Sequence, residues 1–252
     1  MKWTTLFPYC IWEIWKNRNH NNINNLDNYL DIRKVIHAAW EFTFFTERNP
    51  FVEKTINVEI SWIKPNKDVI KLNCDGTFSS KCRRARLGGA FRNNKGDWIV
   101  GYHKLCQAIS PIHAELLALL EGLKIATDMN FIMMEVETDC TKVIKLTYEN
   151  NSNSSDIVCE CRWLMHQLKI PVLKHNFREG NMVAHLLAKQ ATKNVSTSKY
   201  FYHACLPRFV EHEVTKDKNR VCNGIRSMSN NVCNYLATMG NTSALKTSAM
   251  PM

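Results

Sequence analysis

Three acidic residues stand at the ends of expected secondary-structure elements. Asp75 closes the alternating apolar run VIKLNCD, Glu115 lies in the first turn of an expected helix, and Asp139 closes the run FIMMEVETD. Strand ends and helix starts are the places where α/β folds expose functional groups. Three carboxylates at one edge of a sheet repel one another unless a cation lies between them, and such oxygen ligands suit Mg²⁺ or Mn²⁺.

Each acid taken alone also has a structural explanation. Asp75 precedes Gly76, and Asp-Gly is a common turn signal. Glu115 in a first turn would stabilise the helix dipole, and Asp139 would cap the helix that follows it. The structural explanation is the stronger one for any single residue. The three acids together, in this order of elements, favour the metal site.

The elements expected around the acids alternate between strands and helices. Strands are expected in VIKLNCD, in a hairpin over residues 85–105, and over residues 131–139 and 172–177. Helices are expected after the N-cap Ser110 and over residues 140–149, 156–168 and 181–192. This order predicts an α/β fold in which a mixed sheet is flanked by helices.

The two ends of the chain differ in composition from its middle. Apolar residues within 1–20 and over 29–46 have helical spacing, whereas the Asn-rich stretch 17–28 is expected to be a loop. The chain beyond about residue 213 is polar and shows no periodicity. We therefore expect three parts, which are a helical extension over 1–55, an α/β domain over 56–213 and a disordered tail over 214–252.

Composition restricts the class of protein. Lys and Arg number 33 against 23 Asp and Glu, a net charge of +10 that gives mild support to a polyanionic partner such as nucleic acid. The 10 cysteines form no CxxC pair, which indicates reduced thiols in an intracellular protein, nuclear or cytoplasmic, rather than disulfides or zinc fingers. No apolar run is long enough to predict a membrane helix. Nothing in the composition indicates a protein partner or an oligomeric state.

Residues 69–193 resemble a ribonuclease H type 1 domain of the plant branch associated with non-LTR retrotransposon reverse transcriptases. The motifs that carry the resemblance are KLNCDGTF, LGGAFRNNKGDWIVGY, HAELLALLEGLKIA, MEVETDC and REGNMVAHLLAK. The resemblance implies a ribonuclease H-like fold with a five-stranded mixed sheet, three of its strands antiparallel. It also implies an active site of four acids, with Asp75, Glu115 and Asp139 at the first three positions.

The resemblance further implies an activity and its cofactors. Members of the family hydrolyse the RNA strand of RNA–DNA hybrids endonucleolytically, with two divalent ions, Mg²⁺ or Mn²⁺, flanking the scissile phosphate. RNA is distinguished from DNA by its 2′-hydroxyls, which backbone groups near Gly76 are expected to contact. Arg178 and Asn181 flank the site and are candidates for phosphate contact, although Asn181 is equally well explained as the N-cap of the last helix.

The sequence departs from the family pattern at the fourth acid, where His185 stands. Mg²⁺ strongly prefers oxygen, whereas Mn²⁺ or Zn²⁺ accepts an imidazole nitrogen more readily. A histidine at this position is also able to assist proton transfer. The alternative is that the site has decayed, leaving a catalytically inactive nucleic-acid-binding domain of retroelement origin or a reading frame with no selected role.

Three further features each have two explanations. His175 lies where some relatives carry a mobile histidine that aids product release, but a structural place on the sheet face is favoured. The cluster KCRRAR, residues 81–86, is a candidate for phosphate contact, and a solvated hairpin strand explains it equally well. Lys142 and Lys145 are the other candidates for phosphate contact.

Overall fold

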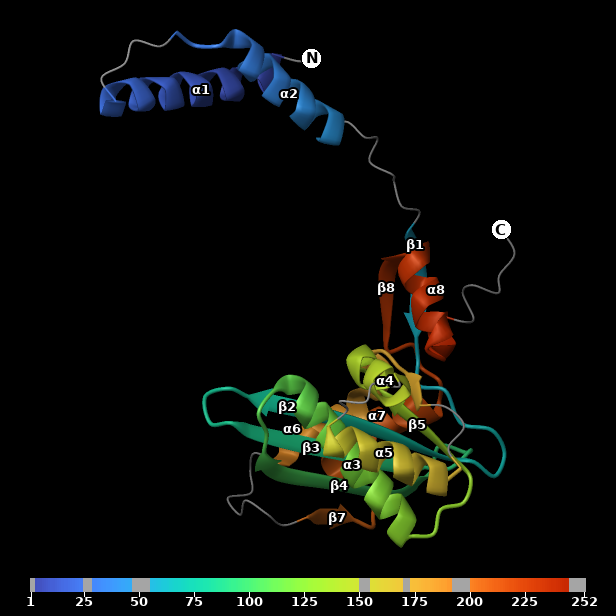
Figure 1. Ribbon diagram of the computed structural model, residues 1–252. Helices are drawn as coiled ribbons and strands as arrows, with labels where there is room; N and C mark the ends of the chain where they lie inside the picture. The colour runs from blue at the N-terminus through green and yellow to red at the C-terminus, as the bar shows by residue number, and fades with distance from the viewer. Residues whose placement is uncertain are drawn as a thin grey trace. The chain divides into compact units, whose positions relative to one another are not determined.

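The structure is a computed structural model that describes residues 3–24, 29–46, 55–149, 155–169, 173–191 and 200–244. The chain divides into two compact units, Met1–Lys54 and Thr55–Met252 (Figure 1). Within the described ranges, no helix combines the length and the apolar character that a membrane span requires.

The first unit consists of two helices, α1 (Trp3–Asn24) and α2 (Ile32–Thr46), which pack against each other. The loop expected over residues 17–28 is wrong in its first part, because α1 continues through the Asn-rich stretch to Asn24. The Asn24 side chain donates to the carbonyl of His20 at 2.9 Å, so it satisfies a backbone acceptor near the helix end. Residues 25–28 lie outside the described ranges.

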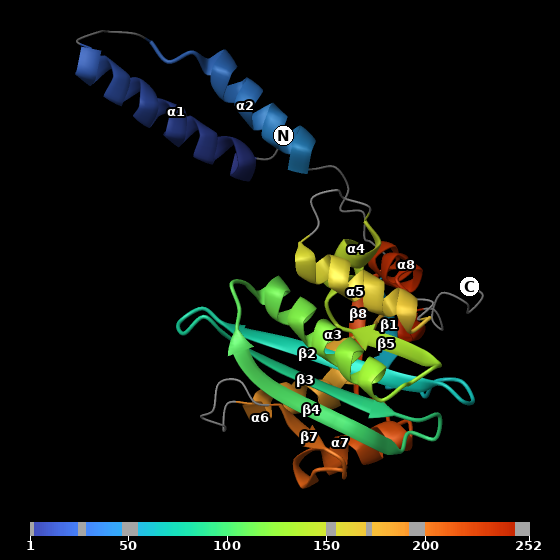
Figure 2. The same ribbon diagram turned by 60° about the horizontal axis from the view of Figure 1, so that its bottom comes forward.

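The second unit is built on a six-stranded mixed sheet in the order β6-β5-β2-β3-β4-β7. Figure 2 shows its strands β5, β2, β3, β4 and β7. The strands are β2 (Ile70–Ser79), β3 (Arg84–Arg92), β4 (Trp98–Gln107), β5 (Met134–Thr138), β6 (Leu173–His175) and β7 (Phe201–His203). Strands β2, β3 and β4 are antiparallel neighbours, and β5 and β6 run parallel to β2. The first five agree with the expected sheet, and β7 adds an edge strand that the sequence did not predict.

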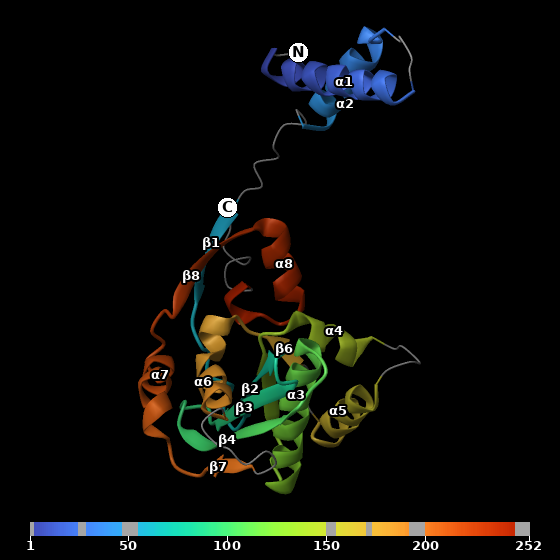
Figure 3. The same ribbon diagram turned by 90° about the vertical axis from the view of Figure 1, so that its left-hand side faces the viewer.

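Helices cover both faces of this sheet (Figure 3). One face packs against α3 (Pro111–Asp128), with α4 (Thr141–Tyr148) and α5 (Asp156–Gln167) beside it, around a core that includes Leu72, Leu119 and Val136. The other face carries α6 (Met182–Gln190), which packs on α7 (Arg208–Lys218). The predicted cap of α3 is confirmed, because Ser110 Oγ accepts from the His113 N–H at 3.1 Å.

The tail predicted to be disordered over 214–252 carries secondary structure within its described residues, 214–244, and residues 245–252 lie outside the described ranges. Strand β8 (Gly224–Ser229) pairs antiparallel with β1 (Thr55–Ile60), and α8 (Asn230–Thr238) follows it. A small separate core joins them, formed by Val58, Ile60, Phe177, Cys233, Leu236 and Ala244. Local periodicity gives no sign of this arrangement, because its hydrogen bonds and apolar contacts come from segments far away in the sequence.

Two histidines join the edge strand β7 to β4. The ring nitrogens His103 Nδ1 and His203 Nε2 lie 2.9 Å apart, and Phe201 stacks on His103 with ring centroids separated by 5.0 Å. Burial, with a contribution from His203, lowers the pKa of His103 to about 4. Burial also lowers the pKa of His203. The folded pair therefore takes up protons less readily than the unfolded chain.

We predict that this pair makes the fold less stable in mild acid. The folded pKa of His103 is depressed, so its stabilisation is complete above the unfolded value of 6.5 and is lost as the pH falls toward about 4. The carboxyls of Glu115 and Asp139 act in the opposite direction, so the test compares the natural chain with His103→Gln in urea unfolding between about pH 7 and about pH 4. Over this range the natural chain should lose stability relative to the variant by an amount on the order of 1–3 kcal/mol, and a pH-independent difference between the two would contradict the assignment.

Candidate metal centre

Asp75 lies inside a strand and not at its end. Strand β2 continues to Ser79, and Asp75 is paired with Gly88 of β3 in the antiparallel register. The parallel partner β5 ends one position earlier, where Cys74 is aligned with Thr138. The Asp-Gly pair is therefore not a turn, and Asp75 lies beside the point where the shorter strand β5 stops.

Gly76 allows helix α3 to approach β2 closely enough to place Glu115. A Cβ atom on Gly76 would lie 2.3 Å from the carbonyl oxygen of Ala114, a distance that no side chain tolerates. The Gly76 N–H donates to Glu115 Oε2 at 3.0 Å, so the backbone of β2 orients this carboxylate. The sequence assigned Gly76 to nucleic-acid contact, and in the structure its N–H is engaged by Glu115.

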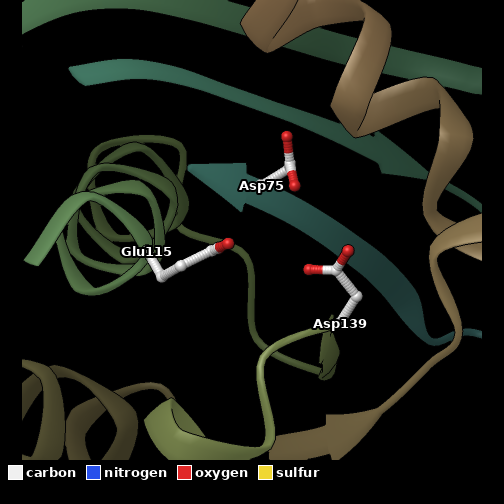
Figure 4. A group of neighbouring side chains, drawn as sticks. All are labelled: Asp75, Glu115 and Asp139. Atoms are coloured by element: carbon white, nitrogen blue, oxygen red, sulfur yellow. The ribbon is translucent and has the colours of Figure 1, made fainter. Parts of the chain in front are cut away.

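The three predicted acids form one cluster (Figure 4). Asp75, Glu115 and Asp139 each contribute a carboxylate oxygen, and these oxygens lie within 4.8 Å of one another. Asp75 comes from β2, Glu115 from the start of α3, and Asp139 follows the end of β5. The group is half-buried to buried, with the Asp75 residue 2% exposed.

Burial and mutual repulsion make the cluster unfavourable as three free anions. Burial raises the pKa of Glu115 to about 9, with Asp75 and Asp139 adding to the effect. Burial also raises the pKa of Asp139 to about 6, and Asp75 again contributes. A divalent cation would supply the missing positive charge, and a set of carboxylate oxygens fits Mg²⁺ or Mn²⁺. The residues present therefore fit the metal that the sequence implied.

His185 reaches the cluster from the first turn of α6. Its Nδ1 atom lies 3.1 Å from Asp75 Oδ2, and its side chain is 19% exposed. Arg178 Nη2 lies 3.2 Å from His185 Nδ1 and 3.1 Å from Nε2. His185, which occupies the fourth position of the expected active site, therefore lies next to the acids, and Arg178 lies next to His185. These two side chains form a basic side to an otherwise acidic site.

The other two predicted residues serve the framework. Asn181 is 1% exposed, and its Nδ2 donates to the carbonyl of Cys74 at 2.9 Å, which ties the short helix η1 (Arg178–Asn181) to β2. Its side chain makes no capping bond to α6. His175 is 6% exposed, and its Nδ1 lies 2.8 Å from the Nδ2 atom of Asn241. This contact agrees with the structural explanation of His175.

A buried polar network, which the sequence reasoning missed, continues from the acids along the same two strands. Lys71 Nζ contacts Glu137 Oε1 and lies 2.7 Å from Glu135 Oε1. Asn73 Nδ2 donates to Glu137 Oε2 at 2.9 Å. The available signal was the alternation itself, because polar residues occupy positions 71, 73 and 75 of β2 and acids occupy 135, 137 and 139 around β5.

Arg92 of β3 extends the network to α7 on the same face of the sheet. Its Nη2 donates to Asn73 Oδ1 and its Nη1 to Asp217 Oδ2, at 2.8 and 2.7 Å. Its guanidinium also lies 3.7 Å from the centroid of the Trp62 ring. Buried charges of this kind are tolerated only when they are paired, so the network holds β2, β3 and α7 in one arrangement.

We predict that Gly76→Ala disrupts the metal centre. The added Cβ must push the start of α3 away from β2, which moves Glu115 and should lower the free energy of unfolding by about 2 kcal/mol or more. Thermal unfolding, with and without Mn²⁺, measures both effects. The matched control is Gly224→Ala, whose Cβ would meet the flexible side chain of Glu179 at 3.2 Å. Equal behaviour of the two variants would contradict the assigned role of Gly76.

We also predict that Asp75→Asn stabilises the metal-free protein and abolishes its response to metal. Loss of one charge relieves the repulsion on Glu115 and Asp139, and it removes a ligand. Melting temperatures in EDTA and in Mg²⁺ or Mn²⁺ test both parts. The control is Asp68→Asn, an exposed carboxylate at a positive φ of 64° that Asn also adopts. A full metal-induced shift in Asp75→Asn would rule out this site.

Comparison with known proteins finds similarity over about half of the chain. Residues 73–191 match the model of a family described as reverse transcriptase-like. A ribonuclease H1 of the archaeon Halobacterium salinarum is similar over 50% of this chain and 98% of its own, with 20% identity and a TM-score of 0.43. No curated protein matches the chain.

Two structures that contain nucleic acid are each similar to about half of the chain. LC11-RNase H1, from compost, was solved in complex with an RNA/DNA hybrid, and it covers 50% of this chain and 99% of its own at 17% identity and a TM-score of 0.45. A foamy viral protease-reverse transcriptase was solved in complex with dsDNA. The match covers 49% of this chain and 92% of the viral chain, at 14% identity and a TM-score of 0.40.

Proposed function

We propose that residues 73–191, which match a family model described as reverse transcriptase-like, form a ribonuclease H type 1 domain and that the chain hydrolyses the RNA strand of RNA–DNA hybrids in a metal-dependent reaction. The observation that carries the proposal is the meeting of Asp75, Glu115 and Asp139, whose carboxylate oxygens lie within 4.8 Å of one another. Three side chains from distant parts of the sequence, held this close in a half-buried site, match the acidic site of the family.

Each of the three acids has a defined part in the proposed reaction. Asp75, Glu115 and Asp139 would hold two divalent ions, which when bound supply an activated water and stabilise the leaving oxygen. Burial strengthens every electrostatic interaction at the site, because it excludes water from around the carboxylates. The Gly76 N–H keeps Glu115 in place before any substrate binds. These features preorganise the site for the substrate.

His185 determines which ion the site favours. Its Nδ1 contacts Asp75 Oδ2, so the imidazole competes with a cation for that oxygen or joins it as a nitrogen ligand. Nitrogen ligands suit Mn²⁺ better than Mg²⁺. We therefore propose that Mn²⁺ supports cleavage better than Mg²⁺ in this chain.

We predict that His185→Asp raises Mg²⁺-supported cleavage about tenfold or more, which is the effect of about 1.4 kcal/mol from one better ligand. The measurement is the cleavage rate of an end-labelled RNA–DNA hybrid in Mg²⁺ and in Mn²⁺. Asp139→Asn, made in the same background, should remove the activity and so serves as the control for contaminating nuclease. An equal rate for His185→Asp and the natural chain in Mg²⁺ would contradict the role given to His185.

One observation favours a second function, that of a catalytically inactive nucleic-acid-binding domain. The Arg178 guanidinium lies against His185 beside Asp75, so its positive charge offsets part of the acidic cluster without any metal. Binding of the hybrid without cleavage, in both the natural chain and His185→Asp and in both ions, would support this second function and exclude the first.

A further inference from the structure

The β2–β3 hairpin presents a continuation of the acidic site on one face of the sheet. Residues directly opposite in an antiparallel pair point to the same face, and so does every second residue of a strand. The register aligns Asp75 with Gly88, Thr77 with Arg86, and Ser79 with Arg84. Two rows of side chains therefore follow Asp75 on its own face, about 7 and about 13 Å along the strand.

The burial of β3 shows which way these arginines point. Ala85 and Leu87 are completely buried in the core under α3, whereas Arg84 is exposed and Arg86 is half-buried. Arg84 and Arg86 thus alternate with core residues and lie on the opposite face, which is the face of Asp75. Thr77 Oγ1 is 3.5 Å from Asp75 Oδ2, so the first row borders the metal centre directly.

The hairpin gathers positive charge that the protein itself does not neutralise. Lys81 and Arg83 in the turn are exposed beside Arg84 and Arg86. Among the ion pairs of the described ranges, none involves any of these four cations. Like charges at neighbouring positions repel one another, and a bound anion would relieve this repulsion.

We propose that Arg84 and Arg86 bind the phosphate backbone of the hybrid, as a contact surface separate from the metal centre. This inference rests on the proposed function, because it places the same substrate along the strand that carries Asp75. A guanidinium donates two parallel hydrogen bonds to a phosphate, and the Thr77 and Ser79 hydroxyls of the same rows are further donors. Contacts of this kind position a duplex without reading its sequence.

The test is the affinity of the full chain for a fluorescent RNA–DNA hybrid, measured in EDTA over a series of salt concentrations so that no cleavage occurs. Arg84→Ala/Arg86→Ala should weaken binding about tenfold or more at low salt. The slope of log K against log salt concentration should become shallower by about 2, because two phosphate contacts are lost.

The matched control is Lys67→Ala/Lys95→Ala. Both lysines are exposed, one just before β2 and the other in the β3–β4 turn, so they lie at the opposite ends of the same strands. This variant removes the same charge as the arginine variant, and it should change affinity less than about threefold. Melting temperatures of both variants establish that each is folded.

The outcomes separate this inference from the proposed function. If the arginine variant binds as the natural chain does, or if the lysine variant loses as much affinity, the hairpin is not a specific contact, whatever the cleavage assay shows. Complete absence of hybrid binding by the natural chain would overturn the inference as well. If the arginine variant loses binding and the natural chain binds the hybrid but does not cleave it, the contact surface is supported and only the proposed hydrolysis is rejected.

Discussion

The repulsion among three buried carboxylates is the constraint around which the second unit is organised. Asp75, Glu115 and Asp139 are held within 4.8 Å although burial and neighbouring charge raise the pKa of two of them. An arrangement of this kind does not arise from local preference, because each carboxylate alone is more stable in water. It persists because the sheet and the close approach of α3 at Gly76 leave the side chains no other place.

The polar network beside the acids explains how the sheet withstands this repulsion. Lys71 lies between Glu135 and Glu137, and Asn73 joins Glu137 to Arg92. Each buried charge of the network has a partner of opposite sign or a hydrogen-bonding amide, so the cost of burial is offset pair by pair. Strand β2, which carries Asp75, and strand β5, which directly precedes Asp139, are thereby fixed side by side. The distance between the two acids follows from this pairing.

The end of the chain holds the loop that brings His185 to the site. Arg226 of β8 donates to Glu179 at 2.8 Å, and its guanidinium lies 5.2 Å from the Phe177 ring centroid. Phe177 belongs to the small core formed with β1 and α8. The loop between β6 and α6, which includes Arg178, is therefore anchored by residues more than forty positions away in the sequence. His185 is held within this anchored frame, where the Arg178 guanidinium offsets part of the charge of the acidic cluster.

Sequence alone was sufficient for the features that depend on local pattern. Local sequence patterns predicted the strands β2 to β6, Ser110 and the apolar stripe predicted α3, and the order of elements predicted that the three acids meet. These features depend on side-chain periodicity and on backbone capping, which act over a few residues. The ribonuclease H resemblance rested on the same local motifs.

Only the tertiary structure decided what depends on distant partners. The Asp75-Gly76 pair has the local sequence pattern of a turn, but pairing with β3 continues strand β2 through both residues. Gly76 is also required for the close approach of α3. The polar tail reads as disordered, but β8 gains its hydrogen bonds from β1, which lies far away in the sequence. The contact of His185 with Asp75 likewise joins residues 110 positions apart. These features depend on the free energy of pairing and burying segments that are far apart in the sequence, and the pattern of neighbouring residues carries no information about those partners.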